Sequence, residues 1–139
     1  MGPVTIPLRP AGSLSSPEEV HAPMQPNPHG WHKASAIMYV EQPVNVGFSR
    51  GPHEPHDETD VGRALDGFLQ QFVHVFETYR DKRIVLVGES YAGMYVPSMA
   101  YYIHQQNKNG RPNDEYDIKL GGIGLGNGWV DAVVQGGTV

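Results

Sequence analysis

The stretch IVLVGESYAG (residues 84–93) decides the fold of this 139-residue chain. It begins with four aliphatic residues, a composition typical of a strand buried inside a parallel sheet. Gly88 ends the aliphatic run, and Ser90 follows two residues later. Ala92 and Gly93 then open a segment of mixed apolar and polar residues long enough for a helix. The stretch therefore predicts a strand that turns sharply into a helix, with Ser90 at the turn.

A serine at such a turn has two interpretations. In α/β-hydrolases the nucleophile stands on a strained strand-to-helix elbow, and small residues two positions before and after it let the backbone fold back. Gly88 and Ala92 flank Ser90 in this way, although Gly is more usual than Ala at the second position. The other interpretation makes Ser90 the N-cap of the following helix, because serine is a common cap. The position of the motif directly after a buried strand favours the elbow.

The elements around this turn alternate. A short apolar run at 36–42 predicts a buried strand, and helical spacing of apolar residues predicts a helix over 60–80. A strand at 83–89, a helix at 92–106 and a further strand at 118–128 follow. This order predicts an α/β protein with a mostly parallel sheet flanked by helices.

The helix predicted over 60–80 is amphipathic. Its apolar positions are Val61, Leu65, Phe68, Phe72, Val75, Phe76 and Tyr79. Residues 1–33 differ, since they hold seven of the twelve prolines and few periodic apolar positions. We therefore expect an irregular, proline-rich segment at 1–33 and an α/β core, containing the serine turn, at 34–139, which the family resemblance given below implies is incomplete.

Composition excludes several classes of protein. The chain is 39% hydrophobic and 18% charged, which is typical of a globular protein. Its formal net charge of −5 gives no basic surface for nucleic acid or an anionic membrane. No apolar run approaches the roughly 20 residues that span a bilayer. The absence of cysteine excludes disulfides and thiolate chemistry. We predict neither nucleic-acid nor membrane partners.

Two further motifs are weaker. His53, His56 and Asp57, in the sequence HEPHD, have the side chains of a zinc site, but flanking prolines and charges favour a solvated loop. The sequence GGIGLGNG has the spacing G-x-G-x-G rather than the G-x-G-x-x-G of a dinucleotide loop. We therefore predict no metal and no cofactor.

Three longer motifs carry a resemblance to a known family. The sequences YVEQPVNVGFS, VLVGESYAGMYVP and GGIGLGNGWVD, in this order and spacing, resemble the serine carboxypeptidases of the α/β-hydrolase fold, the carboxypeptidase Y-like group. The sequence NPHGW resembles the Asn-Pro-x-x-Trp of that group. There, Gly30 and His32 stand where Ser and Asn are more usual. The resemblance covers residues 27–131.

The resemblance implies roles for three residues. Ser90 would be the acylating nucleophile, and the backbone N–H of Tyr91 would donate to the oxyanion of the tetrahedral intermediate. Glu89 would help to bind the free carboxylate at the C-terminus of the substrate. The implied partners are the C-termini of peptides and proteins, and the implied compartment is vacuolar, lysosomal or secreted. The oligomeric state stays open.

The rest of the family's triad is not expected among these residues. The family orders its triad Ser, then Asp, then His along the chain. The only histidine after Ser90 is His104, fourteen residues on in the same predicted helix and therefore about 21 Å away along its axis. A general base must lie within about 3 Å. Asp131 follows the last strand too soon to be the family's acid. The Gly-Gly-Pro-Gly segment that supplies a second oxyanion donor is also absent.

Two interpretations remain. In the first, these residues are a truncated core of a serine-type carboxypeptidase, which removes C-terminal residues by acyl-enzyme hydrolysis. In the second, they form a complete, non-catalytic α/β-hydrolase-like binding or relic protein. Both predict little or no peptidase activity for the 139 residues alone.

Overall fold

The computed structural model describes residues 2–5 and 24–137. The chain divides into two units, residues 1–40 and 41–139. In the first unit β1 (Val4–Thr5) pairs antiparallel with β2 (Gln25–Pro26). The side-chain amide of Asn27 donates to the carbonyl of Gly2 at 2.8 Å, which fastens the two ends of this pair. This short pairing occurs in a segment predicted to be irregular, most of which lies outside the described residues.

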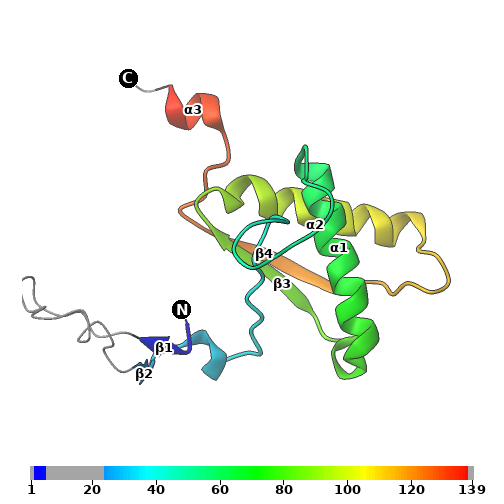
Figure 1. Cartoon of the computed structure of the whole chain (residues 1–139), viewed down its shortest axis with the longest axis horizontal. Coiled ribbons are helices and arrows are strands. Elements are labelled where there is room, and N and C mark those ends of the chain that lie inside the picture. The colour runs from blue at the N-terminus through cyan, green and yellow to red at the C-terminus, as the bar shows by residue number, and fades with distance from the viewer. Residues whose placement is uncertain (1, 6–23, 138–139) are drawn as a thin grey trace, which may run out of the picture. The chain divides into compact units, whose positions relative to one another are not determined.

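The second unit contains the crossover that the sequence predicts. Helix α1 (Glu58–Val75) is followed by β3 (Ile84–Glu89), α2 (Ala92–Asn109) and β4 (Leu120–Gly126). The two strands pair in parallel, so α2 is the crossover helix between them (Figure 1). A short helix, α3 (Ala132–Gly136), lies beyond β4. The predicted strands and helices of this part are therefore present, with ends shifted by a few residues.

Helix α2 covers one face of the two strands. A Cβ at Gly88 would meet Ala92 and Val96 of α2, so the face that carries Gly88 and Leu86 lies against the helix. Side chains alternate along a strand, and Val85 and Val87 accordingly point to the opposite face, where they are 56% and 51% exposed. The described residues place no helix on that face.

The core lies between the two long helices, since α1 packs against α2 (Figure 1). Its buried apolar side chains are Val61, Leu65, Leu69 and Val73 of α1, Val96, Met99, Ala100 and Ile103 of α2, and Ile118.

This core corrects the predicted face of α1. The prediction included Phe68, Val75 and Phe76, but these side chains are 40%, 66% and 52% exposed. Leu69 and Val73, which the predicted set omits, are buried instead. The reason is that α1 has two neighbouring apolar stripes. The aliphatic stripe, whose residues are four apart, faces α2. The aromatic side chains contact one another instead, and the rings of Phe72 and Phe76 are tilted by 41° with centroids 5.0 Å apart.

The N-cap of helix α1 is Asp57, which belongs to the HEPHD sequence that also has the side chains of a zinc site. The Asp57 carboxylate accepts from the Asp60 N–H at 2.9 Å, and the Asp60 carboxylate accepts from the His56 N–H at 3.1 Å. The first bond satisfies an N–H that the start of a helix leaves free, and the second ties the residue before the cap to the first turn. The HEPHD sequence therefore includes the N-terminal cap of α1.

The strand predicted at 36–42 is wrong. The structure assigns no strand to these residues, and Met38 and Tyr39 are 40% and 63% exposed. An extended segment becomes a strand only when another strand accepts and donates its ladder hydrogen bonds. Among the described residues, β3 and β4 pair only with each other.

The loop between α2 and β4 is held by polar side chains of the two helices. Gln70 of α1 exchanges two hydrogen bonds with the backbone of Tyr116, at 2.8 and 2.9 Å. Asn107 of α2 does the same with Ile118, at 2.8 and 3.3 Å. The guanidinium of Arg111 binds both carboxylate oxygens of Asp66, at 2.9 and 2.6 Å. This loop sets where β4 starts, and therefore its register beside β3.

Candidate active site

Ser90 lies at the bend between β3 and α2. It follows the last residue of the strand, and one residue, Tyr91, separates it from the helix. Its φ is +60°, a left-handed conformation that is uncommon for a residue with a side chain. Its side chain is exposed. The bend thus presents the hydroxyl at the carboxyl end of a parallel strand, where ligands of open α/β sheets bind.

The cap interpretation of Ser90 does not fit the hydrogen bonds. The N-cap of α2 is Tyr91, and no side chain caps the helix. Among the described residues, the Oγ of Ser90 makes no hydrogen bond. Its oxygen is therefore available to another group.

Backbone hydrogen bonds fix Ser90 from two directions. Its N–H donates to the carbonyl of Gly126 at 3.1 Å, and its carbonyl accepts from the N–H of Gly93 at 2.9 Å and of Trp129 at 2.8 Å. Gly126 and Trp129 belong to the end of β4 and the turn after it. Sequence reasoning missed this contribution, because the sequence GNGW signals only a turn and not which segment the turn meets.

Small residues make the bend possible. A Cβ at Gly88 would overlap the Cβ of Ala92 and lie 3.1 Å from Val96. A Cβ at Gly93 would lie 2.6 Å from backbone atoms of Trp129. The first contact explains why Ala is accommodated at 92, since its methyl group fills the space that Gly88 leaves.

Tyr91 offers a backbone donor at the bend. Its N–H makes no hydrogen bond in the part of the chain that the structure describes. An unpaired N–H directly after the serine is the donor that an oxyanion hole of this kind requires. The ring of Tyr91 packs between Tyr95 and Trp129, with centroid distances of 4.9 and 5.5 Å. This packing holds the backbone of Tyr91 in place.

Burial raises the pKa of Tyr95, and the nearby Tyr91 and Glu58 raise it further. The phenol of Tyr95 is therefore neutral at physiological pH.

Glu89 is the last residue of β3 and has an exposed side chain. It lies on the strand face that also carries Val85 and Val87, because side chains two residues apart share a face. A Cβ at Gly126 would lie 3.7 Å from the Cγ of Glu89. The small neighbour therefore leaves the approach to the Glu89 carboxylate open.

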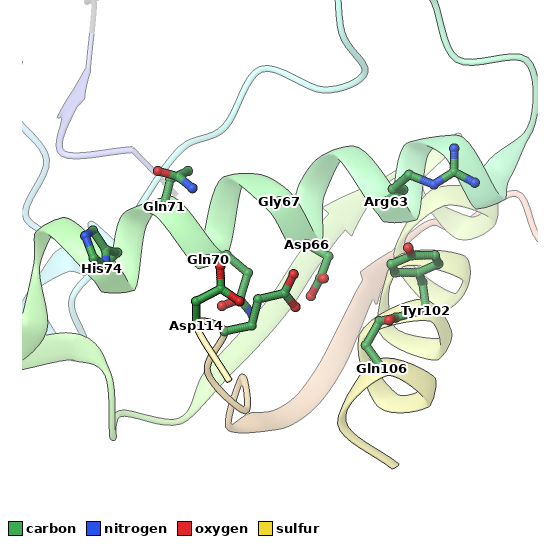
Figure 2. A pocket seen from close by; sticks show the side chains of 10 residues that line it. Arg63, Asp66, Gly67, Gln70, Gln71, His74, Tyr102, Gln106 and Asp114 are labelled. Atoms are coloured by element: carbon green, nitrogen blue, oxygen red, sulfur yellow. The ribbon is translucent and has the colours of Figure 1, made fainter. Parts of the chain in front are cut away.

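His104 and a polar pocket both lie away from Ser90. His104 is exposed on α2, twelve residues and about 18 Å along the helix from Ala92. A polar pocket of about 420 Å³ lies between α1, the C-terminal half of α2 and the loop after it (Figure 2). The figure shows His74 and Gln71 of α1, Gln106 of α2 and Asp114 of the loop around it. None of the three predicted site residues lines this pocket.

In the part of the chain that is described, no helix is long and apolar enough to cross a bilayer.

Comparison with known proteins identifies the family. Residues 7–138 match the family model described as serine carboxypeptidase. The chain is 36% identical over 116 residues to serine carboxypeptidase S10 family member 1 of Dictyostelium discoideum, covering 81% of this chain and 27% of that protein. It is 39% identical over 112 residues to serine carboxypeptidase 3 of Hordeum vulgare, covering 78% of this chain and 22% of that protein. It is 39% identical over 105 residues to the pheromone-processing carboxypeptidase KEX1 of Meyerozyma guilliermondii, covering 75% and 16%.

A solved structure gives the same answer. The crystal structure of Kex1(delta)p, a prohormone-processing carboxypeptidase from Saccharomyces cerevisiae, matches with a TM-score of 0.70 and 29% identity. The match covers 81% of this chain and 25% of that one. The fold is a partial α/β-hydrolase fold, as the sequence predicted. The chain belongs to the serine carboxypeptidase family, and it spans 16–27% of the length of the relatives named above.

Proposed function

We propose that this chain supplies the nucleophile of a serine-type carboxypeptidase, which removes C-terminal residues from peptides. The observation that carries the proposal is Ser90 at a φ of +60° between β3 and α2, with an exposed side chain. Family membership and the unpaired N–H of Tyr91 support it further.

The chemistry assigns one task to each of three groups. The Oγ of Ser90 attacks the last peptide carbonyl, and the N–H of Tyr91 donates to the oxygen that becomes negative in the tetrahedral intermediate. As the Oγ–C bond forms and the C–N bond breaks, the Ser90 proton passes through a base to the nitrogen of the leaving C-terminal amino acid. Water then hydrolyses the acyl-enzyme, which frees the shortened peptide and restores the Ser90 hydroxyl. Glu89 contacts the free carboxylate of the substrate, which restricts cleavage to chain ends. The partners are thus the C-termini of peptides and proteins.

We further propose that these 139 residues alone do not turn over substrate. A serine hydroxyl needs a base near neutral pH, and His104 lies too far along α2 to serve. The triad Asp and His would come from residues outside this sequence. A vacuolar, lysosomal or secreted location follows from the family as a proposal of the same kind.

The decisive experiment places this segment in a relative. Residues 27–131 would replace the matching segment of the Hordeum vulgare enzyme, and the chimera would be assayed on blocked dipeptides and with a fluorophosphonate probe. We expect turnover and labelling that Ser90→Ala abolishes and Ser98→Ala, on α2, does not. A folded chimera without labelling would favour a non-catalytic binding or relic protein. Turnover by the 139 residues alone, dependent on Ser90, would contradict the second proposal.

The same chimera tests Glu89. We expect Glu89→Gln to raise KM for peptides with a free C-terminal carboxylate and to leave peptides with a C-terminal amide nearly unchanged. Glu77→Gln, at an exposed position away from the bend, is the matched control. Equal effects of Glu89→Gln on both substrates would exclude carboxylate binding.

A further inference from the structure

We propose that Trp129 is a positioning residue for Ser90, and that it acts through its backbone N–H rather than its ring. This inference rests on the proposed function, because Ser90 has to be held for a purpose. Ser90 keeps its strained conformation because hydrogen bonds from the turn after β4, here called the clamp, hold its backbone. The start of α2 alone does not hold it.

The strain at Ser90 requires such a clamp. A residue other than glycine is disfavoured in the left-handed region, and it persists there only where the surrounding structure over-determines it. The start of α2 supplies one bond, from the N–H of Gly93 to the Ser90 carbonyl. The net contribution of a single bond of this type is no larger than the strain.

The turn after β4 supplies the rest. The Trp129 N–H donates to the same Ser90 carbonyl at 2.8 Å, while Gly126 accepts from the Ser90 N–H at 3.1 Å. Both polar groups of the Ser90 peptide backbone are thus held by the segment 126–129. Three bonds together outweigh the strain.

The local structure of this segment is built for close approach. Asn127 has a φ of +47°, which reverses the chain so that the N–H of Trp129 comes back to Ser90. The backbone of Trp129 passes directly over Gly93, where no Cβ fits. A Cβ at Gly128 would lie 3.4 Å from the Cα of Gly93, so the turn rests directly on the start of α2.

The test removes the N–H and keeps the ring. Trp129 would be replaced by its α-hydroxy acid analogue in the 139-residue chain, which exchanges one amide for an ester. We expect hydrogen exchange of the Ser90 amide to become faster by about tenfold, the effect of one backbone hydrogen bond. The coupling between the Ser90 amide and Hα protons should also change, because φ leaves the left-handed region in part of the molecules. The matched control is the same exchange at Gly128, whose N–H makes no hydrogen bond among the described residues.

A second variant separates positioning from general stability. In Ser90→Gly there is no Cβ strain to relieve, so the ester at 129 should leave residue 90 in its left-handed conformation. Trp129→Ala keeps the N–H and should preserve the conformation of Ser90, although it loses the ring contact with Tyr91. Unchanged exchange and coupling at Ser90 in the ester variant would overturn the proposal.

If the ester variant does not fold, the proposal is tested on the unmodified chain. We expect a scalar coupling across the hydrogen bond, between the Trp129 nitrogen and the Ser90 carbonyl carbon. A Trp129 amide proton that exchanges with solvent as fast as an unprotected amide would overturn the proposal. These measurements read geometry and not reactivity. A clamp without labelling of Ser90 in the chimera would therefore refute the proposed function and leave the positioning intact.

Discussion

Gly88 and Ala92 occupy one shared space on the two sides of Ser90: a Cβ at Gly88 would overlap the Cβ of Ala92. The end of β3 and the first turn of α2 can therefore lie this close only because one of the two residues has no side chain. This contact sets how sharply the chain bends at the serine.

Gly88→Ala should destabilise the chain. Overpacking typically costs about 1–3 kcal/mol, and we expect a loss in this range in urea unfolding. Gly67→Ala is the matched control, since no atom lies within 4 Å of a Cβ there and alanine favours a helix by up to about 1 kcal/mol. The double variant Gly88→Ala with Ala92→Gly should recover much of the loss. A neutral Gly88→Ala would show that the bend does not depend on this contact.

Ser90→Gly should be more stable than Ser90→Ala. Alanine keeps the strain of a φ of +60°, whereas glycine does not, so the difference should be about 1 kcal/mol in favour of glycine. At Ser98, inside α2, the order should reverse by about the same amount because alanine is the better helix former. Urea unfolding of the four variants measures both differences. The same order at both positions would mean that Ser90 is not strained.

Asp66→Asn should be among the most damaging single changes in α1. The Arg111 side chain is 2% exposed, and burial lowers its pKa, but the hydrogen bonds and charges of Asp66 and Glu115 outweigh burial and raise it. Arg111 is therefore charged, and removal of a buried partner costs about 3–5 kcal/mol. Thermal or urea unfolding would measure the loss.

The surface pair of Arg63 and Asp60 provides the control for that prediction. The Arg63 side chain is 64% exposed, so Arg63→Gln should change stability far less. Replacing both members of the buried pair, as Asp66→Leu with Arg111→Met, should cost less than Asp66→Asn alone. Equal losses from the buried and the surface variants would contradict the role of the buried pair.

Stability should also fall in alkali through Tyr95. Its pKa in the folded chain lies above the ordinary value of 10.0, so the folded state keeps this proton longer than the unfolded state does. The contribution is complete below pH 10 and is lost as pH rises from 10 through the folded pKa. Tyr95→Phe should therefore show a shallower loss of unfolding free energy above pH 10 than the parent chain. Tyr101→Phe, at a position 65% exposed, should behave like the parent.

Local patterns predicted most of the second unit. The aliphatic run, the glycine and the serine predicted the end of β3 and the start of α2 to within a few residues, because strand and helix periodicities differ and small residues mark the bend. Leu69 and Val73 were missed because both stripes of α1 are apolar. Only the partner helix decides which stripe is buried.

Contacts between distant segments could not be predicted in this way. Asp66 and Arg111 are 45 residues apart, and nothing in the surrounding sequence links them. The segment 36–42 has the composition of a strand, but pairing depends on a neighbour. The Trp129 hydrogen bond to Ser90 belongs to the same class. The serine was found from its neighbours in sequence, whereas its conformation is held by residues almost forty positions later.

The two bonds from the segment 126–129 to Ser90 also set an order of assembly during synthesis. A nascent chain that has released β3 and α2 still lacks both donor and acceptor from the later segment, so we expect its serine to relax toward ordinary φ values. The bend would reach its final shape only when Trp129 leaves the ribosome. Ribosome-stalled chains ending before and well after this residue would show the change.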